Sequence, residues 1–321
     1  MASGITHILL TKEVRDKLGD GKLRDILDYG TDSFQVGAVG PDLPYASIAD
    51  SDFILSNESG LADHFHYKKT NQIPLQSLKI LKSLKGKINE EIHYHMFSFF
   101  LGYISHVLAD GIIHPFVRDK VGDYSENKAE HRSLEMQLDV LLFEELTKHT
   151  GFVSELNYTN IHDELENFTN IEGVNEIVKV FSDLIGTTYQ EHYTEEKILG
   201  WVTGLHRMFG VAEGDFPRFY RNLKVNTFTF KNLKDIDRGK ALVLNKPKDR
   251  DINFLKVEEI DFFKDCVPQY YNRFAVVAQK AYDYVFEEGL ELNEMDIPLI
   301  NLDTGRLVND DNLDLIPEFW K

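Results

Sequence analysis

Hydrophobic positions recur along most of this chain at steps of three and four residues, which is the period of an amphipathic α-helix. The segments with this pattern, each expected to be helical, are Lys12–Tyr29, Leu75–Lys85, Glu90–His114, Ala129–Lys148, Val174–Tyr189, Glu195–Phe209 and Val257–Glu288. Alternating runs typical of strands are scarce, and the two best, Asn226–Phe230 and Ala241–Leu244, are short. The pattern therefore predicts an all-α, multi-helix fold.

A stretch of weak periodicity, from about Asn226 to Phe254, separates the last helical segment from the others. It predicts a helical domain over 1–225 and a C-terminal accessory helical segment over 226–321 that packs on it. The 321 residues lie at the upper edge of what one hydrophobic core holds. In the C-terminal part, aromatic residues at roughly helical spacing favour core packing over a lipid-docking surface. They are Phe262, Phe263, Tyr270, Tyr271 and Phe274.

Composition excludes several classes of protein. Lys and Arg total 35 against 53 Asp and Glu, and a net charge of −18 argues against stable binding to nucleic acid. The single cysteine, Cys266, excludes an intrachain disulfide and a Cys-rich zinc site, so any zinc must be bound by His and carboxylate. No secretory signal is recognised at the N-terminus, and the longest apolar stretch, Met96–Val117, is interrupted by serine, histidine and aspartate. We expect no transmembrane segment and a cytoplasmic protein.

Candidate chemistry is concentrated in the histidines of the first part of the chain. Of the 12 histidines, those up to residue 131 are His7, His64, His66, His93, His95, His106, His114 and His131. On the helix expected over Glu90–His114, steps of four turn by about 40°, so His106, Asp110 and His114 lie on one stripe. Three groups in register favour a metal site over three independent core residues. Because Pro115 disfavours helical geometry in the preceding residue, we expect His114 at the frayed end of the helix.

A second pair, His131 and Glu135, is also four residues apart. Such a pair can chelate zinc from one helical face with bonds of about 2.0 to 2.2 Å. Alone it is a weak signal, since Glu135 could equally be a solvated surface residue. Asp139 continues the stripe and is a candidate partner that holds a ligand ring in place.

Two further candidates are expected on loops. Asp42 follows Pro41 in a turn rich in glycine and proline, for which an ordinary Asx turn is the alternative interpretation. His64 and His66 are two residues apart, a spacing that places them on opposite sides of an extended chain. We therefore expect only one of them to bind a metal.

Taken together, these residues resemble the zinc-dependent phospholipase C superfamily over roughly Ile5 to Asp139. That superfamily includes bacterial phospholipases C, the catalytic domain of glycosylphosphatidylinositol-specific phospholipase D and, more distantly, the three-zinc single-strand nucleases. The resemblance rests on Thr6-His7, Gly40-Pro41-Asp42, His64-Phe65, the Gly102–His114 helix, and His131 with Glu135. It implies an all-α fold that holds three zinc ions and hydrolyses phosphodiesters.

The resemblance also implies a ligand set. The first zinc would be held by Asp42, His64, His106 and Asp110, and the second by His114, His131 and Glu135. Asp110 would bridge to a third zinc bound by His7. The amine of Ala2, exposed by removal of Met1, or else His66, would complete this third site. Asp42 is in addition the candidate general base.

The charge balance of such a site suits a phosphodiester. Two or three zinc ions would carry four or six positive charges, against three negative charges from Asp42, Asp110 and Glu135. Bound zinc lowers the pKa of water from 15.7 towards about 7, so hydroxide could attack the phosphorus in line. We expect a zinc-dependent, phospholipase C-like hydrolase that acts on phospholipid or another phosphodiester. A three-zinc nuclease and a non-catalytic, zinc-stabilised helical module are the alternatives.

Substrate preference is less defined. Tyr45, Phe65 and Tyr67 flank expected ligands and could form an aromatic wall for a quaternary ammonium headgroup. The alternative is that these rings pack against helices.

Overall fold

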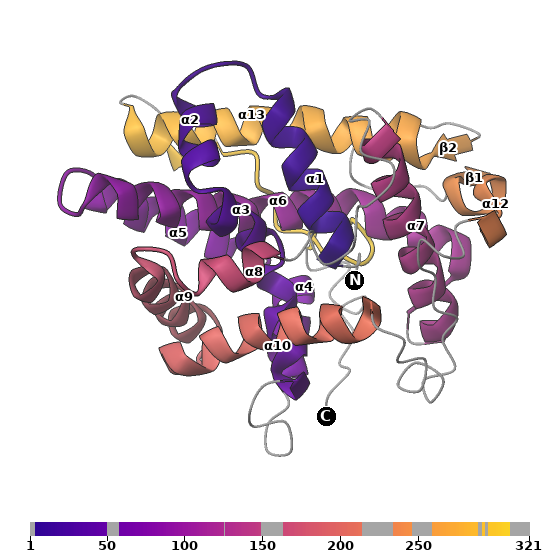
Figure 1. The fold of residues 1–321 in the computed structure, drawn as a ribbon, viewed down its shortest axis with the longest axis horizontal. Helices are drawn as coiled ribbons and strands as arrows, with labels where there is room; N and C mark the ends of the chain where they lie inside the picture. Colours follow the sequence, from indigo (N-terminus) through magenta and orange to yellow (C-terminus); the bar gives the residue numbers. More distant parts are fainter. Residues whose placement is uncertain are drawn as a thin grey trace.

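The computed structural model describes residues 4–49, 58–124, 126–148, 163–213, 234–245, 259–287, 291–292 and 295–308. Within these residues the chain is mostly helical, with a small two-stranded sheet and a non-helical C-terminal segment, so the prediction of an all-α fold is confirmed (Figure 1). The strand predicted at Asn226–Phe230 and the amine of Ala2 lie outside the described residues.

The helices follow one another along the chain as α1 (Gly4–Lys17), α2 (Lys22–Tyr29), α3 (Thr31–Ala38), the 3-10 helix η1 (Gly40–Ala49), α4 (Ser59–Tyr67), α5 (Gln72–Leu84), α6 (Glu90–Val121), α7 (Lys128–Lys148), α8 (Asp163–Phe168), α9 (Val174–Tyr189), α10 (Glu195–Glu213), α12 (Arg238–Leu242), the π-helical turn η4 (Phe262–Cys266) and α13 (Val267–Phe286). Strands β1 (Val243–Asn245) and β2 (Glu259–Asp261) pair antiparallel, with Leu244 opposite Ile260.

Helix α6 is the centre of the fold, and α3, α5, α7 and α13 pack against it (Figure 1). All of its residues from Met96 to Val117 are buried. By length and apolar composition α6 could cross a membrane, but its apolar window is 100% buried inside the fold. The hydrophobicity of this helix is therefore explained by its place in the core.

Two glycines bring α3 and α6 into backbone contact. A Cβ atom added to Gly37 would lie 1.9 Å from the carbonyl oxygen of Phe99, and one added to Gly102 would lie 2.1 Å from that of Phe34. No side chain fits at either position. The close crossing brings the carbonyl oxygen of Ala38 to 2.8 Å from Nδ1 of His106.

Several helix boundaries differ from the prediction. The segment Lys12–Tyr29 is two helices, α1 and α2, separated at Gly21, whose φ of 155° favours glycine. The first of these already begins at Gly4. The strand predicted from Ala241 begins at Val243, because α12 extends to Leu242.

The expectation that His114 lies at a frayed helix end is wrong, since α6 continues through Pro115 to Val121. Proline cannot supply the N–H that would bond the carbonyl of Gly111. Tertiary packing encloses this part of the helix. A Cβ atom on Gly305 would lie 2.5 Å from Cγ of Pro115 and 2.8 Å from the oxygen of Gly111, so the C-terminal segment fits closely against the interruption.

The C-terminal helix α13 packs against α1, α5 and α6. Phe262, Tyr270 and Phe274 are fully buried, and Phe263 and Tyr271 pack at the edge of the same core, as expected for a core stripe. The predicted helix from Val257 to Glu288 is in fact β2, η4 and α13 in succession. The domain boundary predicted after residue 225 lies outside the described residues and stays a prediction.

Candidate metal centre

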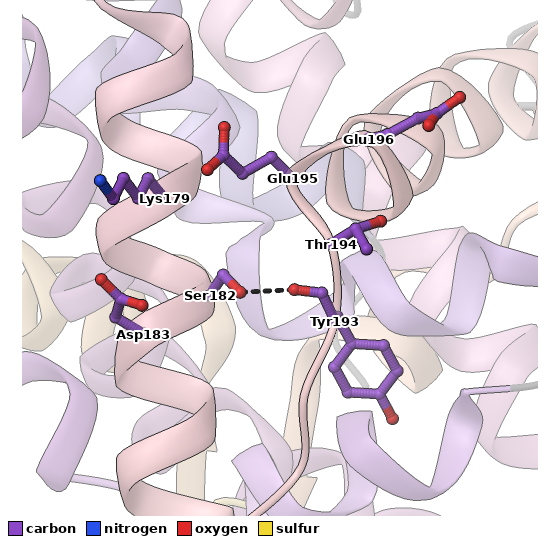
Figure 2. A pocket seen from close by; sticks show the side chains of 7 residues that line it. All are labelled: Lys179, Ser182, Asp183, Tyr193, Thr194, Glu195 and Glu196. Carbon is purple, nitrogen blue, oxygen red and sulfur yellow. Dashed lines mark hydrogen bonds between the residues drawn. The ribbon is translucent and has the colours of Figure 1, made fainter.

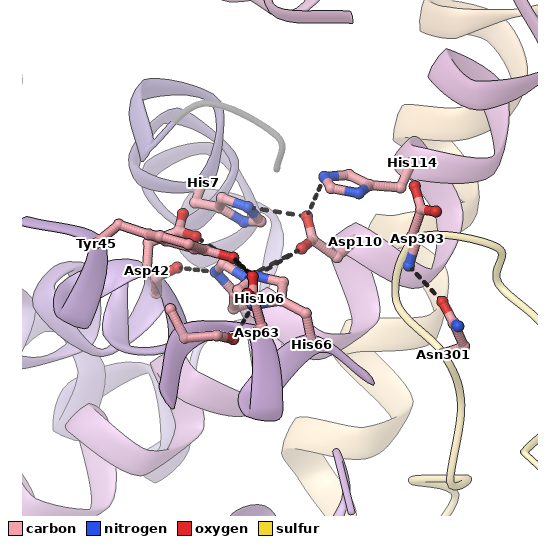
Figure 3. A network of polar contacts seen from close by, with 12 residues as sticks. His7, Asp42, Tyr45, Asp63, His66, His106, Asp110, His114, Asn301 and Asp303 are labelled. Carbon is pink, nitrogen blue, oxygen red and sulfur yellow. Dashed lines mark hydrogen bonds and ion pairs between the residues drawn. The ribbon is translucent and has the colours of Figure 1, made fainter. Parts of the chain in front are cut away.

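Five segments of the chain contribute imidazole and carboxylate groups to one buried centre, and Figure 3 shows six of these groups, which surround Asp110 and include it. Its members are His7 on α1, Asp42 on η1, His66 on α4, His106, Asp110 and His114 on α6, and His131 and Glu135 on α7. They form three groups, and within each group one donor atom from every residue lies within 4.8 Å of the others. All eight residues are buried.

Asp110 lies at the junction of these groups. Its Oδ1 is 3.1 Å from Nε2 of His7 and 3.3 Å from Nε2 of His114. Its Oδ2 is 3.1 Å from Nε2 of His106 and 3.4 Å from Nε2 of His66. One carboxylate therefore faces four imidazoles, a geometry suited to bridging two cations.

His66 and His106 present their ring nitrogens to each other. The two Nε2 atoms are 3.2 Å apart, while Nδ1 of His66 donates to the carbonyl of Ala62 and Nδ1 of His106 to that of Ala38. A neutral ring with its proton on Nδ1 has a lone pair on Nε2. Two facing lone pairs are compatible only with a positive charge between them, either a proton on Nε2 of His66 or a metal ion. The Oδ1 of Asp42, 3.4 Å from Nε2 of His66, adds a third donor.

The second group joins α6 to α7. Oε1 of Glu135 is 3.2 Å from Nε2 of His131 and 3.7 Å from Nε2 of His114. Within the described part of the chain, both ring nitrogens of His7 and His131 and both carboxylate oxygens of Asp110 are buried without a partner in hydrogen-bond geometry. Buried polar atoms are normally satisfied, and metal coordination would satisfy one nitrogen of each of these rings and the oxygens of Asp110. The donor set therefore fits zinc, which prefers imidazole nitrogen and carboxylate oxygen when cysteine is absent.

The pKa values agree with this interpretation. Burial would raise the pKa of Asp110, but His114, His106 and His7 together hold it well below its usual range. Burial also favours a neutral His114, whose pKa is well below normal. In contrast, the carboxylates of Asp110 and Asp42 overcome burial and raise the pKa of His66 to about 10. Ionised carboxylates and neutral imidazoles are the forms that bind metal, and the proton on His66 marks where a cation is favoured.

The structure places His66, and not His64, at this centre. Residues 59–67 form helix α4 instead of the expected loop, and a separation of two turns the side chains to opposite helical faces. His64 points away and pairs through Nδ1 with Oε1 of Glu191 at 3.0 Å, with 34% of its side chain exposed. The expected assignment of His64 to the first metal is therefore corrected in favour of His66.

This difference gives a direct prediction. Replacing His66 by Ala is expected to lower the zinc content by about one ion per chain and to reduce hydrolysis by more than about 100-fold, since even outer partners of metal ligands contribute 10- to 100-fold. The matched variant His64→Ala removes a partly exposed contact with Glu191, of about 0 to 1 kcal/mol, and should change neither quantity. Elemental analysis and rate measurements on both variants test the assignment. Equal zinc loss in both would contradict it.

Residues around the centre have several roles. Asp139 accepts hydrogen bonds from the backbone N–H of Thr6 at 3.0 Å and from its hydroxyl at 2.6 Å, so it fixes the backbone next to His7. Phe65 is fully buried against Tyr103 and Phe181 and forms no exposed wall. Tyr45 lies beside the centre, where its hydroxyl donates to Oδ1 of Asp63 at 2.6 Å (Figure 3).

Two contacts with the residues of the centre have no clear signal in the sequence. Arg132 lies 3.3 Å from Oε2 of Glu135 and is marked only by its place next to His131. The C-terminal segment reaches back to α4, where the N–H of Leu302 donates to the carbonyl of His66 at 2.9 Å. More than two hundred residues separate these two groups in the chain, so no local pattern indicates their contact.

A hollow of about 430 Å³ lies between α9 and the start of α10 (Figure 2). Its lining includes Lys179, Asp183, Glu195 and Glu196, and the hydroxyl of Ser182 donates to the carbonyl of Tyr193 across it. None of the eight residues of the metal centre lines this hollow. It is therefore separate from the candidate chemistry.

The fold and the centre define an all-α protein with a buried imidazole and carboxylate site for metal ions. A family model, described as zinc dependent phospholipase C, matches residues 6–198 of the chain. The chain belongs to this family of zinc-dependent phospholipases C. No curated protein and no solved structure matches it. The matched region contains all eight residues of the centre, but not the segment that carries Leu302.

Proposed function

We propose that this protein hydrolyses phosphodiesters in a zinc-dependent reaction, and that its substrate is a phospholipid or a related phosphoester. The observation that carries the proposal is the convergence of eight buried imidazole and carboxylate donors, joined through Asp110. Membership of the zinc-dependent phospholipase C family supports the same conclusion.

The charge of the centre supports an anionic substrate. Asp42, Asp110 and Glu135 contribute three negative charges, while neutral imidazoles contribute none. Two or three zinc ions would exceed this charge, so the loaded centre is positive inside a chain with a net charge of −18. When bound, zinc supplies a Lewis acid for a phosphoryl oxygen and makes water more acidic.

Within this proposal, the chain's own residues divide the remaining work. His66, His106, His114 and His131 would hold the metals, and the backbone carbonyls of Ala62 and Ala38 orient the first two rings. Asp42 is the residue we assign to accept a proton from the attacking water. Its pKa is lowered, because His106 and His66 outweigh burial, so the carboxylate is ionised at neutral pH.

The test uses bis-p-nitrophenyl phosphate and p-nitrophenyl phosphocholine with the purified protein. We expect hydrolysis that increases with pH through roughly 7 and is abolished by a chelator. Replacing Asp42 by Asn should reduce the rate by about 10² to 10⁴-fold, the usual contribution of a general base. The control Asp28→Asn, at an exposed carboxylate on α2, should have no effect.

Each alternative predicts a different result. Full activity of the Asp42 variant would show that Asp42 has only a structural role in its turn. Faster cleavage of single-stranded nucleic acid than of the lipid analogues would indicate the nuclease alternative. A zinc-loaded protein that hydrolyses none of these compounds would favour the non-catalytic module.

A further inference from the structure

Arg132 is a permanent cation at the boundary between the metal centre and solvent. It follows His131 directly on α7, and 38% of its side chain is exposed. The side chains of His131 and Glu135 are 0% and 1% exposed. One turn of helix therefore carries two buried metal donors and, beside them, an arginine whose side chain is partly exposed.

The carboxylate of Glu135 connects Arg132 to the centre. Its Oε1 faces the imidazoles of His131 and His114, while its Oε2 is 3.3 Å from Nη1 of Arg132. The carboxylate of Glu135 therefore lies between the guanidinium of Arg132 and the imidazoles of His131 and His114.

Among the residues that the structure describes, Arg132 uses only a small part of its hydrogen-bonding capacity. A guanidinium has five N–H donors in a rigid planar fork. The bond to Glu135 uses one of them, and the structure gives Arg132 no further hydrogen bond to any residue it describes. Such a fork matches two oxygens of a phosphate group.

We propose that Arg132 is a substrate-binding residue, whose unused N–H donors bind non-bridging oxygens of the phosphodiester. This inference rests on the proposed function, since it assumes that the centre receives a phosphate group. Arg132 would hold the anion from the solvent side, while Glu135 keeps the guanidinium at a fixed place relative to the metal donors. The alternative, that Arg132 only positions Glu135, predicts a loss of zinc and no specific loss of phosphate binding.

The test measures inorganic phosphate binding to zinc-loaded protein by calorimetry, together with zinc content by elemental analysis. Replacing Arg132 by Gln is expected to leave zinc content unchanged and to weaken phosphate binding by about 10- to 100-fold, as for loss of a charge-assisted hydrogen bond. Arg132→Lys keeps the charge without the fork and should fall between the wild type and the Gln variant. The control Arg24→Gln removes an arginine on α2 that also pairs with carboxylates, and should bind phosphate normally.

The inference would be overturned if both Arg132 variants bound phosphate as tightly as the wild type, compared per zinc-loaded molecule. This holds whether or not the zinc content falls. The kinetic counterpart is an increased KM for bis-p-nitrophenyl phosphate with a smaller change in kcat. Because phosphate binding is measured without turnover, this result is independent of whether the wild type hydrolyses any diester. Failure of the proposed function is therefore distinguishable from failure of the role of Arg132.

Discussion

Replacing Asp110 by Asn is expected to remove bound zinc and activity together. Its two oxygens face four imidazoles at 3.1 to 3.4 Å, so this carboxylate belongs to more than one metal group. Asparagine removes the negative charge and one acceptor oxygen, and turns an N–H₂ group towards ring nitrogens. We expect a loss of at least about one zinc ion per chain and more than about 100-fold in rate, because outer partners alone contribute 10- to 100-fold.

Elemental analysis and hydrolysis of bis-p-nitrophenyl phosphate measure this effect, and circular dichroism establishes that the helices remain. The matched control is Asp119→Asn, which lies on the same helix but is not one of the eight donors. A variant at position 110 with normal zinc content would show that Asp110 does not bridge the groups.

Removing zinc with a chelator is expected to destabilise the whole fold. A ligand present at 1,000 times its Kd stabilises the native state by about 4.1 kcal/mol per site. The donors come from five segments, so the loss of the metal removes a link between α1, η1, α4, α6 and α7 at once. Each kcal/mol of lost stability lowers the Tm by about 2 to 4 °C, so the Tm should fall by roughly 10 °C or more. It should recover on addition of zinc.

The pH dependence of the chelated protein follows from His66. Without metal, its pKa is about 10, above the value of about 6.5 in an unfolded chain, so the protonated ring stabilises the fold. This contribution is fully present below pH 6.5 and is lost as the pH rises through 10. The Tm of the chelated protein should therefore fall between pH 6.5 and 10.

A Tm that is insensitive to complete zinc removal would contradict a structural role for the centre.

Local spacing was sufficient for most of the helices and for parts of the site. The four-residue steps of His106, Asp110 and His114, and of His131 and Glu135, place each set on one helical face wherever the helices lie. Helix α9 has the predicted bounds, and α5, α6, α7 and α10 overlap the predicted segments. Periodicity succeeds here because the helical repeat depends only on neighbouring residues.

Only the tertiary structure decided how these faces meet. The glycine contact between α3 and α6 brings Ala38 to the ring of His106, and the phase of α4 against α6 selects His66 over His64. Packing also carries α6 through Pro115, against the local preference for a helix end. A residue's spacing fixes the direction of its side chain about its own helix axis. The rotation and distance of that axis relative to another helix depend on contacts between residues far apart in the chain, and these placed His7, Asp42 and His66 around Asp110.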